Sequence, residues 1–459
     1  MNTNYALPFR RAGRMLPPGP RGAPVVGVSS AILSDRLRFF TGVAQRYGDI
    51  AYMRAGAAEL YLISRPEWIK YVLQENHRNY QKSRLYRKME RLLGTGLVTS
   101  NGDFWLRQRR LAQPAFHRRR IAGMAGQIAD LAAAVAERWA PAAAEGRPVD
   151  MTAEMLRLTL QVISTTMFST SAESAAPTVE RELQVVMDHT ADTFWAPFDL
   201  SALPTPRNLR FRRSVAALDK VVMGIIEERR RTGRSGDDLL GMLLEARDEE
   251  TGAQMDDRQL RDEAMTIYMA GHETTASTLT WAWYLLSLHP LAARQLQAEL
   301  DEQLGGRLPT LEDLPKLTYL RMVVDEVMRL YPAAWMISRT PLKDDEIGGY
   351  RIPAGAVVSM SPYVVHRLPT LWDNPEGFDP QRFSPERAAA RQPYAFFPFA
   401  GGPRQCIGNS LALMESQLIL ATLAQRYRLD LLPGQRILPD PSVTLRPNGP
   451  VMMRLVARG

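Results

Sequence analysis

The sequence has a single cysteine, Cys406, among its 459 residues. One cysteine excludes an internal disulfide framework and any zinc or iron–sulfur site built from several cysteines, and it fits a reducing compartment. No apolar run reaches the length of a signal peptide or of a membrane-spanning helix. We therefore expect a cytoplasmic protein without a membrane span.

Acidic residues are missing from the first 34 positions, which carry arginines at 10, 11, 14 and 21. A mitochondrial transit peptide is also rich in arginine and poor in acids, but it needs an amphipathic period, which is not visible here. The Pro17–Pro20 run breaks any helix. Residues 1–22 are therefore predicted to form a proline-rich leader.

Composition gives a formal net charge of +8 and 45% hydrophobic residues, enough for a sizeable core. A basic balance suits nucleic acid, a membrane surface or an acidic protein partner. The sequence has no zinc-finger or stacked-aromatic RNA motif, so no nucleic-acid partner is expected. No repeat, low-complexity tract or linker divides the chain, and a single domain over residues 1–459 is predicted.

Helical periodicity dominates the chain and the predicted strands are short, so the fold class is mainly α with small peripheral β-sheets. The longest predicted helix runs from Asp256 to Leu288, with Asp256 and Gln259 as a capping box and Pro290 after its end. At 1.5 Å per residue it would be roughly 50 Å long, enough to cross a large domain. Further helices are predicted at 66–75, 104–112, 121–145, 151–168, 178–193, 210–231 and 318–330.

Strands are predicted at 50–54 and 59–64 around Gly56, and short strands near Leu445 and at 452–456. A hairpin is predicted from 349–352 and 356–359, and an irregular loop at 84–100. The aromatic stretch Phe194–Phe198 is either a packed loop or a hydrophobic mouth that could also touch a membrane surface. A proline-rich stretch, 367–399, leads to Cys406.

Residues 399–408 read Phe-x-x-Gly-x-Arg-x-Cys-x-Gly, and a helical pattern begins at Asn409. A cysteine at a helix start is a candidate thiolate, because free N–H groups and the positive helix end stabilise the anion. Glycines allow a flat ligand to approach the backbone closely. An isolated cysteine can also be buried and inert.

Inside the long predicted helix, Glu273 and Thr274 place an acid beside a hydroxyl. Gly271 costs about 1 kcal/mol in mid-helix, which indicates that something packs close to the backbone. A zinc-protease motif starting at His272 would need histidine at 276, where Ala276 stands. The plain alternative is a core helix in which Thr274 bonds back to a carbonyl.

Taken together and in order, these motifs resemble the cytochrome P450 family. The resemblance covers essentially the whole chain and departs from the family at Ala400, where glycine is usual. The Pro17–Pro20 run is similar to the hinge of membrane-anchored relatives. The implied fold is a triangular helical prism around haem, with a long central helix at about 256–288. The matching pieces are Trp105 with Arg109, residues 270–275, Glu326 with Arg329, Phe378–Phe383 and the 399–408 motif.

The resemblance implies haem b as cofactor, with Cys406 as the thiolate ligand of its iron. Phe399 would shield the sulfur, N–H groups up to Gly408 would temper its charge, and the Gly401–Gly402 pair would make room for the haem. A structural ion network of Glu326, Arg329 and Arg382 would fix the loop before the cysteine. The haem propionates would be held by Trp105, Arg109, Arg339 and Arg404.

The implied reaction is a monooxygenation with O2, two electrons and two protons, in which Thr274 and Glu273 relay the protons. The substrate would be lipophilic, with a terpenoid-like natural product favoured and a fatty acid or polyketide as alternatives. Further contacts are expected from 84–98, Phe194–Phe198 and the region of Thr444. The core of the pocket would be Ala270, Thr274, Trp335, Met336 and Ile337.

Electrons would come from a separate ferredoxin- or flavodoxin-type protein and its reductase, docked on Arg107, Arg110 and Arg118–Arg120 of a monomer. A haem-thiolate enzyme that uses peroxide or rearranges its substrate is an alternative, as is a non-catalytic haem sensor or carrier. The remaining alternative is a purely structural helical protein. The intact Glu273–Thr274 pair favours the dioxygen route.

Overall fold

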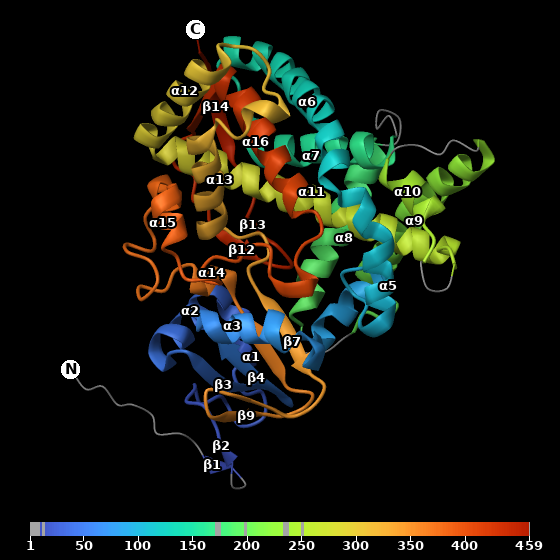
Figure 1. Ribbon diagram of the computed structural model, residues 1–459, viewed down its shortest axis with the longest axis vertical. Coiled ribbons are helices and arrows are strands. Elements are labelled where there is room, and N and C mark those ends of the chain that lie inside the picture. Colours follow the sequence, from blue (N-terminus) through green and yellow to red (C-terminus); the bar gives the residue numbers. More distant parts are fainter. Residues whose placement is uncertain are drawn as a thin grey trace.

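The computed structural model describes residues 10–11, 14–169, 176–196, 200–232, 238–248 and 252–458. A large helical part adjoins a smaller part that is rich in strands (Figure 1). In these ranges no helix combines the length and the hydropathy needed to cross a membrane. Most of the predicted leader before Pro17, and residues 197 and 198 of the predicted aromatic stretch, lie outside the described residues.

Helix α11 (Asp257–Leu288) crosses the middle of the helical part (Figure 1), as predicted. The side chain of Asp256 accepts from Gln259 N–H, and the Gln259 side chain accepts from Asp256 N–H, so the predicted capping box is confirmed. Gly271 is the predicted point of close packing. A Cβ added there would lie 2.7 Å from Cδ1 of Ile163, on α7 (Met151–Phe168), so a larger side chain would push the two helices apart.

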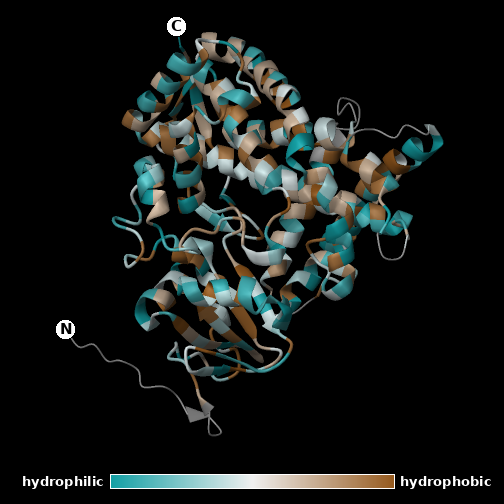
Figure 2. Cartoon of the chain, viewed as in Figure 1, coloured by the Kyte–Doolittle hydropathy of each residue, from teal (hydrophilic) through white to brown (hydrophobic). Residues whose placement is uncertain are grey.

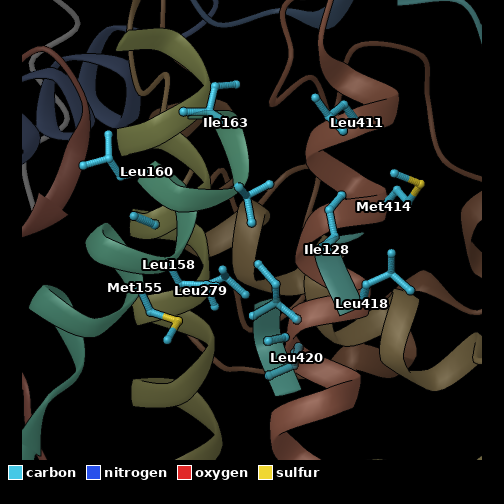
Figure 3. Packing of buried hydrophobic residues seen from close by; sticks show 14 of the residues in the cluster. Ile128, Met155, Leu158, Leu160, Ile163, Leu279, Leu411, Met414, Leu418 and Leu420 are labelled. Carbon is cyan, nitrogen blue, oxygen red and sulfur yellow. The ribbon is translucent and has the colours of Figure 1, made fainter. Parts of the chain in front are cut away.

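The main hydrophobic core fills the space between α6 (Arg118–Ala144), α7, α11 and α16 (Asn409–Arg426). Figure 3 shows Ile128 of α6, Leu158 of α7, Leu279 of α11 and Leu418 of α16 among its side chains. Further helices around this core are α5 (Gly102–Ala112), α8 (Ala176–Phe194), α9 (Pro206–Thr232), α10 (Leu239–Glu245), α12 (Pro290–Leu304) and α13 (Thr318–Leu330).

Helix α9 extends away from this core. Figure 2 shows hydrophilic residues along its outer end, where Arg229, Arg230 and Arg231 form the last turn. The arrangement of helices around a continuous apolar centre agrees with the predicted mainly α fold class.

The largest sheet has the strand order β3-β4-β10-β7-β5. β3 and β4 form the hairpin predicted around Gly56, with Ala55 opposite Ala58. The bounds of the five strands are Ile50–Ala55, Ala58–Ile63, Val357–Met360, Ile337–Pro341 and Tyr80–Lys82.

The predicted hairpin of 349–352 with 356–359 is wrong. β9 (Tyr350–Ile352) pairs with β8 (Asp345–Ile347), whereas β10 pairs with β4 and β7. All four residues of β10 are buried, so this strand takes a central place in the large sheet and both of its edges are occupied. The turn residues between β9 and β10 therefore connect two sheets.

The predicted irregular loop at 84–100 is partly helical. It contains the 3-10 helix η3 (Arg84–Met89) and α4 (Glu90–Leu93). Gly94 has a φ of 56° and a Cβ there would overlap the side chain of Asp262, so the segment lies directly on α11. The N–H of Thr95 donates to Asp262 at 2.8 Å, which fixes this contact.

Besides the β8–β9 pair, the described residues form three further small sheets. The strands predicted near Leu445 and at 452–456 are present as β13 and β14. The sheets are β11-β14-β6 (Tyr427–Leu431, Met452–Ala457, Pro148–Asp150), β12-β13 (Pro439–Pro441, Leu445–Pro447) and β1-β2 (Arg10–Arg11, Arg14–Met15).

The predicted ion network is assembled at the end of α13. Arg329 and Glu326 are fully buried, and two guanidinium N–H groups donate to the two carboxylate oxygens at 2.7 and 2.8 Å. Arg382 lies 3.4 Å from the same carboxylate, and the N–H of Asp379 donates to it at 2.9 Å. Arg329 also donates to the carbonyl oxygens of His366, Pro375 and Gly377. One buried pair thus ties α13 to the chain that leads towards Cys406.

We predict that Glu326→Gln lowers the free energy of unfolding by about 3–5 kcal/mol, because it leaves the charge of Arg329 buried without its carboxylate. Urea titration followed by circular dichroism measures the change. Arg387→Gln is the matched control: its pair with Asp379 is half-exposed, so the loss should stay below about 1 kcal/mol. Equal losses in the two variants would contradict a structural role of the network.

Candidate active site

The cysteine loop positions Cys406 just before α16. The N–H of Cys406 donates to the carbonyl oxygen of Phe399 at 3.0 Å, which closes the loop on itself. The thiol is accessible at the surface of the loop, while the protein atoms around it raise its pKa by desolvation. A hydrogen bond from the backbone of Gly408 and the charge of Arg109 oppose that rise in pKa, and both favour a thiolate.

The two glycines before the cysteine make room for neighbouring segments of the chain. Gly402 has a φ of 67°, and a Cβ there would overlap the carbonyl of Leu73. A Cβ on Gly401 would overlap the ring of Tyr394. The pair lets the loop pack tightly against neighbouring chain segments.

The backbone conformation at Ala400 explains why glycine is usual at this position. Its φ is 60°, in the left-handed region where glycine carries no steric cost. The usual glycine at this position therefore follows from the backbone conformation, and this chain tolerates an alanine in a conformation that disfavours it.

Three of the predicted cofactor-binding cations gather near the cysteine loop. Arg404 lies 4.0 Å above the ring of the buried Trp105 and donates to Ser100 O. Arg109 donates to Gln405 O, and the buried Arg339 donates to Ser338 O. Burial lowers the pKa of all three, for Arg404 to about 10. Within the described ranges none of these arginines forms an ion pair with a carboxylate.

Lys82 is a fourth cation at this site, which the sequence reasoning missed. It stands opposite Arg339 in the β5–β7 pairing and donates to Leu97 O. Burial, then Arg404 and Arg339, lower its pKa well below the usual value, while Glu263 opposes this. A lysine at the end of a three-residue strand looks like a surface residue in the sequence, so only the strand pairing reveals it.

The donor set fits haem. Like charges directly opposite each other in a sheet are destabilising, and buried cations need a counter-charge. Glu263 is the nearby carboxyl, but burial raises its pKa to about 7, and one of its oxygens has no hydrogen-bond partner. Two propionate groups would supply the missing negative charge to Lys82, Arg339 and Arg404.

Helix α11 supplies a second wall. Ala270 is exposed and Thr274 is half-buried, although most of their neighbours in this helix are buried. Thr274 Oγ1 donates to Ala270 O at 2.7 Å, which is the back-bonded geometry that the sequence left open. Its oxygen remains available as an acceptor.

A cavity of about 240 Å³ lies against this face of α11. Ala270, Thr274, Trp335 and Met336 line it as predicted, but Ile337 does not. Ile337 is buried in the core of the large sheet, because successive strand residues point to opposite faces and Ser338 takes the place at the cavity. The other predicted segments contribute Leu85, Tyr86, Met89, Leu92, Leu93, Val98, Phe194, Trp195 and Thr444.

The two tryptophans of the cavity wall share one acceptor. Trp195 Nε1 and Trp335 Nε1 each donate to Ser442 O at 3.2 Å, and their ring centroids are 5.4 Å apart. Phe194 and Trp195 line the cavity, and Trp195 also packs against its neighbours. In these two residues the stretch is therefore a packed loop and a wall of the hydrophobic cavity at once. Both indole N–H groups are already bonded to this backbone carbonyl, so the rings offer the cavity mainly apolar surface.

Glu273 lies between this cavity and a second one of about 860 Å³ on the other side of α11, since it lines both. Burial raises the pKa of Glu273 to about 7. Arg446 Nη1, 3.7 Å from the carboxylate, opposes that rise and also pairs with Asp188 and Asp440. The carboxyl can therefore gain or lose a proton near neutral pH.

Part of the predicted basic docking face is paired within the protein. Arg110 lies 3.2 Å and Arg107 3.9 Å from the buried carboxylate of Asp248. Arg118–Arg120, at the start of α6, are exposed. The positive surface therefore centres on α6, with α5 contributing less than the sequence indicated.

Comparison with known proteins agrees with this geometry. The family model for cytochrome P450 matches residues 17–454. The chain is 39% identical over 417 residues to the cyclooctat-9-en-7-ol 5-monooxygenase of Streptomyces melanosporofaciens, covering 90% of each chain. It is 39% identical over 439 residues to cyclooctatin synthase of the same organism, covering 95% of this chain and 94% of the other.

It is also 34% identical over 441 residues to the pentalenene oxygenase of Streptomyces avermitilis, covering 96% of this chain and 97% of that protein. Among solved structures, the haem domain of cytochrome P450DA has a TM-score of 0.87 at 30% identity, covering 96% of this chain and 98% of that one. This chain therefore belongs to the cytochrome P450 family of monooxygenases, which bind haem through a cysteine thiolate.

Proposed function

We propose that this P450 oxidises a neutral, terpenoid-like molecule held in the 240 Å³ cavity. The observation that carries the proposal is the lining of that cavity: it contains no lysine, arginine or histidine among the described residues, and its one ionisable acid is Glu273. A fatty acid carboxylate would find no cation there and would be repelled by ionised Glu273. The relatives named for cyclooctatin and pentalenene act on the same kind of skeleton.

Cys406 is proposed as the axial ligand, and Arg109, Arg339, Arg404 and Lys82 as the partners of the propionates. The bound haem supplies the oxidising chemistry, while the protein orients the substrate and manages protons. Trp105 would support Arg404 by stacking beneath it. The hydrogen bond of Gly408 to the sulfur would temper the charge of the thiolate.

Glu273 and Thr274 are proposed as the proton relay. Glu273 reaches both cavities, so it can take a proton from water in the larger, polar cavity and release it beside Thr274 in the smaller one. Burial favours the acid form and Arg446 favours the carboxylate. These opposing effects leave the carboxyl ready to exchange its proton at neutral pH.

A separate acidic electron-transfer protein is proposed as the electron donor, docked on Arg118–Arg120. The support is the exposure of these three consecutive cations on α6. Opposite charges on the two surfaces would accelerate encounter and orient the complex.

We predict that Cys406→Ser loses the red-shifted Soret band of the reduced, carbon monoxide-bound form and all monooxygenase activity, because a hydroxyl does not replace the thiolate. Absorption spectroscopy of the purified variant is the measurement. Ser410→Ala, on the exposed start of α16, is the control and should keep the band. A thiolate-type band in Cys406→Ser would contradict the assignment.

Thr274→Ala is expected to bind haem and substrate but to release most of its reducing equivalents as peroxide, because the relay loses its hydroxyl. The fraction of reducing equivalents that appears as product should fall roughly 100-fold, the lower end of the usual range for loss of a proton-transfer group. Thr278→Ala is the control, since Thr278 also bonds back to a carbonyl but does not line the cavity. Undiminished coupling in Thr274→Ala would exclude the relay.

Reduction by an acidic ferredoxin should slow several-fold when salt is raised to about 0.5 M, where charges are screened beyond a few ångström. Stopped-flow measurement of haem reduction tests this. Arg119→Gln should weaken the salt dependence, whereas Arg38→Gln, on the distant helix α2 (Arg36–Tyr47), should leave it unchanged. Reduction that does not respond to salt would rule out electrostatic docking.

A further inference from the structure

Lys88 joins two separate walls of the 240 Å³ cavity. It belongs to η3, whose Leu85, Tyr86 and Met89 line one side. Its Nζ donates to the carbonyl oxygens of Thr193, Phe194 and Ala196 at 3.0, 2.9 and 2.7 Å. These carbonyls lie at and just beyond the end of α8. We call this set of hydrogen bonds the Lys88 bridge.

The chemistry of the Lys88 bridge suits a strong but reversible contact. The last carbonyls of a helix have no partner within the helix, and they carry the negative end of its dipole. An ammonium group has three N–H donors and a full positive charge. One side chain thus donates to three carbonyl acceptors at once, and each of these hydrogen bonds can be exchanged for one to water.

The far side of the bridge is itself anchored. Trp195 follows directly after α8, donates to Ser442 O, and lies 5.4 Å beneath the guanidinium of Arg36. Phe194 and Trp195 both line the cavity. The end of α8 is therefore fixed to the β12–β13 side of the molecule, and Lys88 connects η3 to this fixed point.

The size of the cavity indicates why this connection matters. Ligand pockets commonly measure roughly 300–1,000 Å³, and the cavity has about 240 Å³. A terpenoid skeleton in this space requires a wall to move as it enters. η3 and the end of α8 are two walls of this cavity that Lys88 connects.

We propose that Lys88 is a positioning residue that holds two walls of the substrate cavity together, and that the Lys88 bridge must open when substrate enters and product leaves. The proposal rests on the proposed function in one respect, that the cavity is where the substrate binds. It assigns to Lys88 control over the rate of exchange, separate from the chemical step.

The test compares wild type with Lys88→Met, which keeps a long apolar stem and removes the charge. Stopped-flow mixing of the haem-loaded protein with phenylimidazole, an iron-binding probe, gives association and dissociation rates from the Soret shift. Both rates should rise roughly fivefold or more in Lys88→Met, the scale expected when hydrogen bonds to a charged group are lost. The equilibrium constant should change less than either rate.

A second measurement does not depend on haem chemistry. Hydrogen exchange followed by mass spectrometry should show faster exchange in Lys88→Met for peptides that cover η3 and residues 190–196. Lys88→Arg should restore slow exchange and slow rates, because a guanidinium also donates to carbonyls. Arg84→Met removes a charge from the exposed start of η3 and should behave as wild type.

The outcomes separate the two proposals. Unchanged rates and unchanged exchange in Lys88→Met would overturn the role of the bridge while leaving the proposed function intact. Equal acceleration in Arg84→Met would also overturn it, since any lost charge on η3 would then suffice. A wild-type protein without a Soret shift would instead refute the proposed function, and the exchange data would still decide on the bridge.

Discussion

Buried positive charge without matching negative charge is the constraint on which the site depends. Lys82 and Arg339 stand opposite each other in neighbouring strands, and Arg404 and Arg109 approach from the cysteine loop and α5. The sheet contributes two of these cations, and the cysteine loop and α5 contribute one each, to the same site. A dianionic cofactor would turn this repulsion into attraction, so residues that weaken the empty site would stabilise the loaded one.

Helix α11 borders two cavities of different character. One face borders the apolar cavity through Ala270 and Thr274, and the carboxyl of Glu273 also reaches the polar one. Its length is set by a capping box at Asp256 and by Pro290 beyond its end. Glu273, whose pKa is raised to about 7, lies where the two cavities meet. Proton transfer from the polar cavity into the apolar one requires an acid at this position.

The sequence was a reliable guide wherever the signal is local. The capping box, the close contact at Gly271 and the pairing of Glu326 with Arg329 all depend on neighbours within a few residues or on one helix face. Strand pairing depends on distant segments, so the 349–359 hairpin was wrong and Lys82 was missed. Ile337 is predicted in the pocket because its side chain is large and apolar, but side chains alternate along β7 and Ile337 points to the other face.

If Lys82 and Arg339 bind the propionates as proposed, haem is also a folding ligand. A chain without cofactor must hold two basic residues in register, and any anion that binds only the native state shifts the equilibrium towards it by mass action. The amount of correctly folded enzyme in a producing cell would then depend on haem supply. Cofactor insertion and folding would be thermodynamically coupled.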